Sequence, residues 1–130
     1  MSSENVTFTN KQGLTLAAKM DTPTDRSPRA FALFAHCFTC TKNIPTIRKI
    51  VHGLTDEGLG VLTFDFTGLG DSEGEFSDST FATQTEDLIS AAAYLRRETG
   101  EGPAIVAGHS LGGTAALYAA RKIDSVKGVA

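Results

Sequence analysis

Three short runs of almost wholly apolar residues constrain the fold of this chain most strongly. They span residues 30–35, 60–64 and 104–107. Short apolar runs of this kind are typical of parallel strands that are covered on both faces. Apolar residues at helical spacing lie between the runs, and Gly58 and Gly100 stand where the two intervening helices should end. The pattern therefore predicts alternating strands and helices around a mainly parallel sheet.

The patterns on either side of this region extend the predicted sheet. Residues 6–9 and 14–17 alternate apolar and polar side chains around a turn-like segment, which indicates an antiparallel hairpin with one exposed face. An Ala-rich helix is expected over 111–122, and a further strand begins near Val126. We expect one domain over residues 1–130, with an N-terminal antiparallel hairpin and then a mainly parallel α/β sheet of about six strands flanked by helices.

Charge and cysteine content limit the classes of partner and compartment. Lys and Arg total 12 and Asp and Glu total 15, so the formal net charge is −3. No basic cluster is visible, so we expect no nucleic-acid partner and no membrane partner. No secretory signal is apparent after Met1, and no apolar run reaches the roughly 20 residues of a membrane helix. Two cysteines cannot form a disulfide framework, which favours a cytoplasmic location.

The segment GHSLGG at 108–113 carries the clearest chemical signal. It fits G-x-S-x-G and lies between a predicted buried strand and a predicted helix, where a nucleophilic serine must stand on a tight turn. Gly108 and Gly112 would leave room for that turn, and the amide of Leu111 would point at a developing oxyanion. Ser110 is therefore the expected nucleophile. The alternative is a Gly-rich turn with an unreactive serine, and the G-x-G-x-x-G of a dinucleotide loop is absent.

A second signal follows the first parallel strand, at His36, Cys37 and Phe38. In a serine hydrolase of this architecture the backbone amide of Cys37 or Phe38 would supply the second oxyanion donor. Cys37 and Cys40 also form a C-x-x-C pair, which leaves a thiol-redox role open. A zinc site needs about four ligands, and no second Cys/His pair with metal spacing follows. We therefore expect no metal and no cofactor.

A serine nucleophile needs a base, because its hydroxyl must lose a proton during attack. The histidines are His36, His52 and His109. His52 falls inside a predicted helix and is expected at the surface. His36 and His109 lie beside the predicted oxyanion loop and the serine, so both are candidate catalytic residues, although a structural role is an alternative for each. A histidine from a neighbouring subunit is a third possibility.

Together these motifs resemble the α/β-hydrolase family. The hairpin, the loop at His36, the segment 65–72 and the serine elbow follow one another in the family's order. The segment is similar to the D-x-R-G-x-G-x-S loop, but Thr67 stands where Arg is usual. HCFTC at 36–40 with FDFTGLG at 64–70 resembles the hydrolase half of bacterial proteins that carry an osmotically-induced-protein-C-like domain. No sign of that second domain is present.

The resemblance implies a carboxylic-ester hydrolase that acts on short-chain acyl esters. Ser110 matches the family nucleophile, whereas the triad acid and histidine, which follow later strands, have no counterparts in this sequence. The resemblance thus implies a truncated or minimal α/β-hydrolase fold with weak activity. Losing the base of a triad can leave about 10³–10⁴-fold rate enhancement from the oxyanion hole and binding. The alternative is a non-catalytic fragment or an assembly module.

The predicted edge of the sheet also bears on assembly. A strand over 126–130 would have unpaired N–H and C=O groups at its open edge. The helices over 83–97 and 111–122 would lose a covering layer that the family carries. We therefore expect a homo-oligomer, most simply a dimer.

Overall fold

A computed structural model describes residues 1–36, 42–78, 80–109 and 111–130. The elements, in chain order, are β1 (Ser2–Thr9), β2 (Thr15–Thr22), β3 (Ala30–Ala35), α1 (Pro45–Asp56), β4 (Leu59–Phe64), the 3₁₀ helix η1 (Phe76–Asp78), α2 (Phe81–Thr99), β5 (Ile105–Gly108), α3 (Leu111–Ala120) and β6 (Gly128–Val129).

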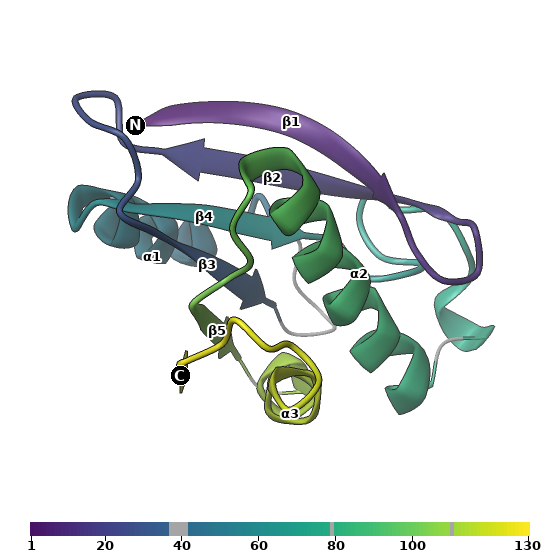
Figure 1. The fold of residues 1–130 in the computed structure, drawn as a ribbon. Coiled ribbons are helices and arrows are strands. Elements are labelled where there is room, and N and C mark those ends of the chain that lie inside the picture. The colour runs from purple at the N-terminus through teal and green to yellow at the C-terminus, as the bar shows by residue number, and fades with distance from the viewer. Residues whose placement is uncertain (37–41, 79, 110) are drawn as a thin grey trace.

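Within the described residues, six strands form a single sheet in the order β1-β2-β4-β3-β5-β6. β1 pairs with β2, and β2 with β4, in antiparallel fashion. The pairs β3–β4, β3–β5 and β5–β6 are parallel. Helix α1 lies on one face of the sheet, and α2 and α3 lie on the other (Figure 1). The predicted hairpin and the predicted mainly parallel sheet are therefore confirmed.

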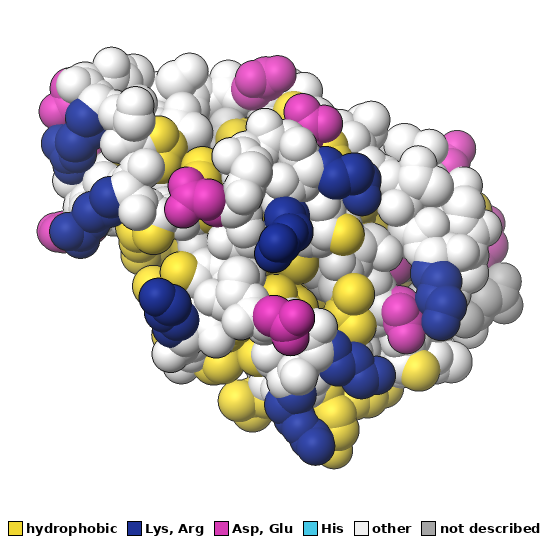
Figure 2. All heavy atoms as spheres, viewed as in Figure 1, with side chains coloured by type: hydrophobic (Ala, Val, Ile, Leu, Met, Phe, Trp, Pro, Cys, Tyr) yellow, Lys and Arg dark blue, Asp and Glu magenta, His cyan; other side chains and the backbone are white. Residues whose placement is uncertain are grey.

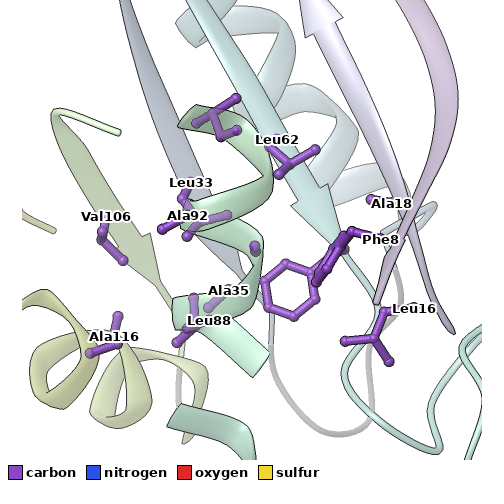
Figure 3. Close-up of a cluster of buried hydrophobic side chains, with 14 of the residues drawn as sticks. Phe8, Leu16, Ala18, Leu33, Ala35, Leu62, Leu88, Ala92, Val106 and Ala116 are labelled. Atoms are coloured by element: carbon purple, nitrogen blue, oxygen red, sulfur yellow. The ribbon is translucent and has the colours of Figure 1, made fainter. Parts of the chain in front are cut away.

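The run at 30–35 is uninterruptedly apolar because β3 is buried on both faces. Its side chains alternate: Leu33 and Ala35 join the core against α2 and α3, whereas Ala32 and Phe34 join the core against α1. Figure 3 shows the first of these cores, with Leu33 close to α2. Since neither face of β3 reaches water, no polar residue is needed at alternate positions.

The helices end close to the predicted positions. Thr80 caps α2, because its hydroxyl accepts a hydrogen bond from the Thr83 amide at 3.1 Å, and Gly100 ends α2 with a φ of 81°. α1 begins at Pro45, which is tolerated in a first helical turn. Among the described residues, no helix is both long enough and apolar enough to cross a membrane.

The last strand is shorter than the sequence predicts. We expected a strand from Val126, but β6 contains only Gly128 and Val129. The amide of Val126 donates to the carbonyl of Ile123 at 3.2 Å, so it still belongs to the turn that follows α3. Pairing with β5 begins only after that turn.

Candidate active site

The serine elbow falls between a strand and a helix, as its sequence indicates. β5 ends at Gly108 and α3 begins at Leu111, while Ser110 itself lies outside the described residues. A Cβ added to Gly113 would lie 3.4 Å from the carbonyl oxygen of Gly108. The start of α3 thus approaches the end of β5 closely, and a side chain at Gly113 would be tightly packed against it.

The elbow and the loop after β3 leave the sheet side by side. β3 and β5 are parallel neighbours in which Ala35 pairs with Gly108. The amide of His109 also donates to the carbonyl of Ala35 at 3.1 Å. The carboxyl ends of adjacent parallel strands are where α/β proteins build their sites. The predicted oxyanion donors Cys37 and Phe38 lie outside the described residues, but the strand that leads to them ends beside the elbow.

One buried carboxylate, which the sequence reasoning missed, organises this edge. Asp65 directly follows β4 and is fully buried. Its Oδ1 lies 3.2 Å from Nε2 of His36 and accepts the Lys42 amide at 2.9 Å. Its Oδ2 accepts the Lys42 ammonium at 2.8 Å and the Asp71 amide at 3.1 Å. The sequence signal was an Asp placed immediately after an apolar strand.

These contacts keep Asp65 ionised although it is buried. Burial alone would raise its pKa, but the hydrogen bonds from His36 and Lys42 outweigh burial and hold the pKa well below its usual range. Burial likewise acts to lower the pKa of Lys42, but the hydrogen bonds and negative charges of Asp65 and Asp71 raise it above its ordinary value. The two side chains therefore form a buried ion pair.

His36 is held inside this network. Its side chain is fully buried, and its ring packs edge-on against Phe66 with a centroid distance of 5.6 Å. Its Nε2 faces the Asp65 carboxylate. The arrangement agrees with the structural role considered for His36, and a catalytic role for it stays a prediction.

The other two histidines are accessible. His109 is exposed and lines an apolar cavity of about 210 Å³ together with Phe34 and Ile47. His52 lies on α1 with its Nε2 3.4 Å from Oδ2 of Asp56. The expected surface position of His52 is confirmed. His109 stands next to Ser110 in the chain and remains a candidate base.

A second buried carboxylate fixes the loop after β4 from the other side. Asp87 of α2 accepts the amide and the hydroxyl of Thr67 at 2.9 and 2.7 Å and the side-chain amide of Asn10 at 3.1 Å. Burial raises the pKa of Asp87, and these neutral donors only partly oppose it. Thr67, at the position where the resemblance leads us to expect Arg, thus anchors this loop to α2.

No set of metal ligands is present among the described residues. Within 1–36, 42–78, 80–109 and 111–130, no group of three or more His, Cys, Asp or Glu side chains could hold a metal ion. Cys37 and Cys40, which left a redox role open, lie outside these ranges.

Solved structures with the same fold include esterases. The esterase domain of a Rhodothermus marinus protein is 46% identical with a TM-score of 0.80, and the match covers 99% of this chain and 49% of that one. An esterase from Pyrococcus furiosus superposes with a TM-score of 0.86 at 22% identity, and the match covers 99% of this chain and 48% of the esterase chain. At this identity the likeness shows the fold alone.

A curated relative is the mouse mitochondrial palmitoyl-protein thioesterase ABHD10. It is 32% identical over 77 residues, which make up 56% of this chain and 25% of that protein. The chain thus spans about half the length of the two solved structures and a quarter of the length of the thioesterase.

Residues 26–130 match the family described as serine aminopeptidase, S33. The match contains β3 to β6 with α1, α2 and α3, and therefore both the buried Asp65 and the serine elbow. With the sheet order and the esterase folds above, it places the chain in the serine aminopeptidase S33 family of α/β hydrolases.

Proposed function

We propose that the protein is a carboxylic-ester hydrolase with Ser110 as its nucleophile. The observation that carries the proposal is the position of the G-x-S-x-G segment between β5 and α3, beside the end of β3. The esterase domain that is 46% identical supports the same reaction class. Ser110 Oγ would attack the acyl carbon, and the tetrahedral intermediate would collapse to an acyl-enzyme with loss of the alcohol. Water would then release the acid.

The oxyanion would be stabilised by backbone amides. Leu111, at the start of α3, would supply one donor, and Cys37 or Phe38 would supply the other. Such donors act on charge that develops only in the transition state, so they raise kcat rather than substrate affinity.

A histidine would take the proton of Ser110. His109 is exposed and adjacent in the chain, whereas His36 is buried against Asp65. A histidine of a neighbouring subunit would serve equally. A general base must come within about 2.6–3.2 Å of the hydroxyl, or reach it through one water.

Short-chain esters with good leaving groups are the proposed substrates. Their alcohols depart with little acid help, whereas an amide needs a proton delivered to nitrogen. The family description names an aminopeptidase, so an amide substrate is the natural comparison.

The test is hydrolysis of p-nitrophenyl acetate and butyrate, with an aminoacyl p-nitroanilide beside them. Ser110→Ala should abolish ester hydrolysis, while Ser77→Ala, which changes an exposed serine of η1, should leave it intact. A serine-directed organophosphate should label Ser110. Full activity in Ser110→Ala would refute the proposal, and an inactive wild type would favour the non-catalytic fragment or assembly module.

We further propose that the chain forms a homo-oligomer in the cytoplasm. β6 lies at the edge of the sheet, and Leu117 and Tyr118 on α3 are 59% and 53% exposed. Figure 2 shows apolar side chains gathered on the surface over α3, at the lower edge of the molecule. Exposed apolar surface of this kind is typical of an interface. The cytoplasmic location rests on the low cysteine count.

A further inference from the structure

Asp65 contacts the two described residues that flank positions 37–41. His36 immediately precedes residues 37–41 and Lys42 immediately follows them, and both donate to the same carboxylate. Oδ1 alone contacts both residues, through Nε2 of His36 and the backbone amide of Lys42. The positions at which this segment begins and ends are thus tied to a single side chain.

The carboxylate is itself held to the sheet. Ala35 pairs with Phe64 in the parallel β3–β4 ladder, so His36 and Asp65 leave neighbouring strands at the same level. The amide of Asp65 also donates to the carbonyl of Ala17 in β2 at 2.9 Å. The Asp65 carboxylate is therefore positioned by the sheet and not by a loop.

The segment after Asp65 closes over the carboxylate. The Asp71 amide donates to Oδ2, and the hydroxyl of Ser72 donates to the Asp65 carbonyl at 2.5 Å. A Cβ added to Gly70 would overlap the carboxylate group. Water is thus kept from Asp65, and the hydrogen bonds to it act in a medium where they are strong.

We propose that Asp65 is a positioning residue that sets where the segment 37–41 leaves and rejoins the fold, and through it the amide that binds the oxyanion. The proposal rests on the proposed function, because the predicted donors Cys37 and Phe38 belong to that segment. Because Asp65 is fully buried, it would act through its neighbours rather than on the substrate. It fixes His36 and Lys42, one residue and four residues away from the predicted donors.

No neutral replacement can keep all four contacts. An Asn at this position has one acceptor oxygen and one NH₂ group. If its oxygen faces His36 and the Lys42 amide, its NH₂ meets the Lys42 ammonium and the Asp71 amide, which are themselves donors. Asp65→Asn should therefore release at least two of the four donors and leave the buried Lys42 ammonium with the exposed Asp71 carboxylate, 3.1 Å away, as its remaining ion-pair partner.

The kinetic signature separates positioning from simple loss of fold. A displaced oxyanion donor lowers kcat and leaves KM almost unchanged. Removing one such donor outright costs about 10²–10³ in kcat, so we expect Asp65→Asn to lower kcat by about tenfold to a hundredfold. KM should stay within about twofold. The matched control is Asp87→Asn, which removes a carboxylate that is equally buried and also bonds a backbone amide, but contacts neither His36 nor Lys42.

A double variant distinguishes position from charge balance. Lys42→Met removes the ammonium and keeps the backbone amide that donates to Oδ1. Combined with Asp65→Asn, it removes the buried cation that has lost its buried counter-ion, so the midpoint of unfolding should recover relative to Asp65→Asn alone. If Asp65 acts through position, kcat stays low in the double variant. Recovery of kcat together with stability would overturn the proposal.

Hydrogen–deuterium exchange provides a readout that does not depend on activity. Peptides over 36–42 should exchange faster in Asp65→Asn than in the wild type, while peptides from α2 should be unchanged. Unchanged exchange over 36–42 together with unchanged kcat refutes the positioning role. Ester hydrolysis that survives Ser110→Ala refutes the proposed function instead, and the exchange result then still decides whether Asp65 fixes the segment.

Discussion

Asn10 and Asp87, 77 positions apart in the chain, share a buried hydrogen bond of 3.1 Å. Asn10 also accepts the amides of Gln12 and Leu14 through its side-chain oxygen, at 3.0 and 2.9 Å. Its amide group is therefore oriented, with NH₂ facing Asp87. One side chain thus closes the turn between β1 and β2 and binds that turn to α2.

The burial of Asp87 leads to a prediction about how the stability of the protein depends on pH. Burial raises the pKa of Asp87 above its ordinary value of 3.8, so the folded protein holds that proton more tightly than the unfolded chain does. The contribution of Asp87 to stability is thus fully present below 3.8 and is lost as the pH rises through the raised value. Asp87→Asn cannot ionise. The unfolding free energy of the wild type minus that of Asp87→Asn should therefore fall from about pH 4 upward, by at most about 1.4 kcal/mol per pH unit.

Denaturant unfolding of both proteins at a series of pH values measures this difference. A difference that stays constant or increases with pH would contradict the role assigned to Asp87. Ionisation of Asp65 is common to both proteins and cancels in the comparison.

Gly70 and Gly13 offer a matched pair of substitutions. Both have positive φ, 50° and 81°, so an alanine costs about 1–2 kcal/mol of backbone strain at either position. A Cβ at Gly13 meets nothing within 4 Å, whereas one at Gly70 overlaps the carboxylate of Asp65. Gly70→Ala should therefore be more destabilising than Gly13→Ala by about 1–3 kcal/mol, the usual cost of overpacking.

The readout is the midpoint of chemical unfolding, with ester hydrolysis measured on the same samples. Gly70→Ala should also lower kcat, because it displaces Asp65, and Gly13→Ala should not. Equal stability losses in the two variants would show that strain alone accounts for both.

The identity of the base can be tested one histidine at a time. We expect His36→Ala or His109→Ala to lower kcat, and His52→Ala, a change at the surface of α1, to leave it unchanged. A variant that has lost the base should regain activity when imidazole is added, because imidazole can accept the proton instead. A variant that has lost only a structural contact should not. Wild-type rates in all three variants would show that none of these histidines is the base.

The predicted oligomer is tested by sedimentation at low micromolar concentration. We expect a dimer, whose interface should bury at least about 1,000 Å². Replacing Leu117 and Tyr118 together by Ser should shift it toward monomer. Ile50→Ser, which changes an exposed side chain on the opposite face, should not. A folded wild-type monomer at that concentration rules out the self-association.

Local pattern was enough to predict most of the fold. The run at 30–35 coincides with β3, and Gly100 ends α2 where expected, because burial on both faces and helix termination leave direct marks in sequence. β6 was predicted too long, because no residue pattern in the sequence indicates the backbone hydrogen bond between Val126 and Ile123 that extends the turn after α3.

The candidate site could be predicted only in part. G-x-S-x-G pointed to Ser110 because the turn it needs is local. The roles of Asp65 and Lys42 could not be foreseen, because they depend on which strands become neighbours. From the sequence alone, Lys42 cannot be told from an ordinary surface lysine. Only the pairing of β3 with β4 brings it to Asp65.

The order of strands in the sheet has a consequence for how the chain acquires its shape during synthesis. β3 lies between β4 and β5, both of which follow it in the chain, so it emerges from the ribosome before either neighbour exists. About 25 further residues must be synthesised after β3 before β4 can pair with it, and about 70 before β5 can. Until then β3 exposes apolar side chains and unpaired backbone groups. The nascent chain is most prone to aggregation or chaperone binding while β3 is unpaired.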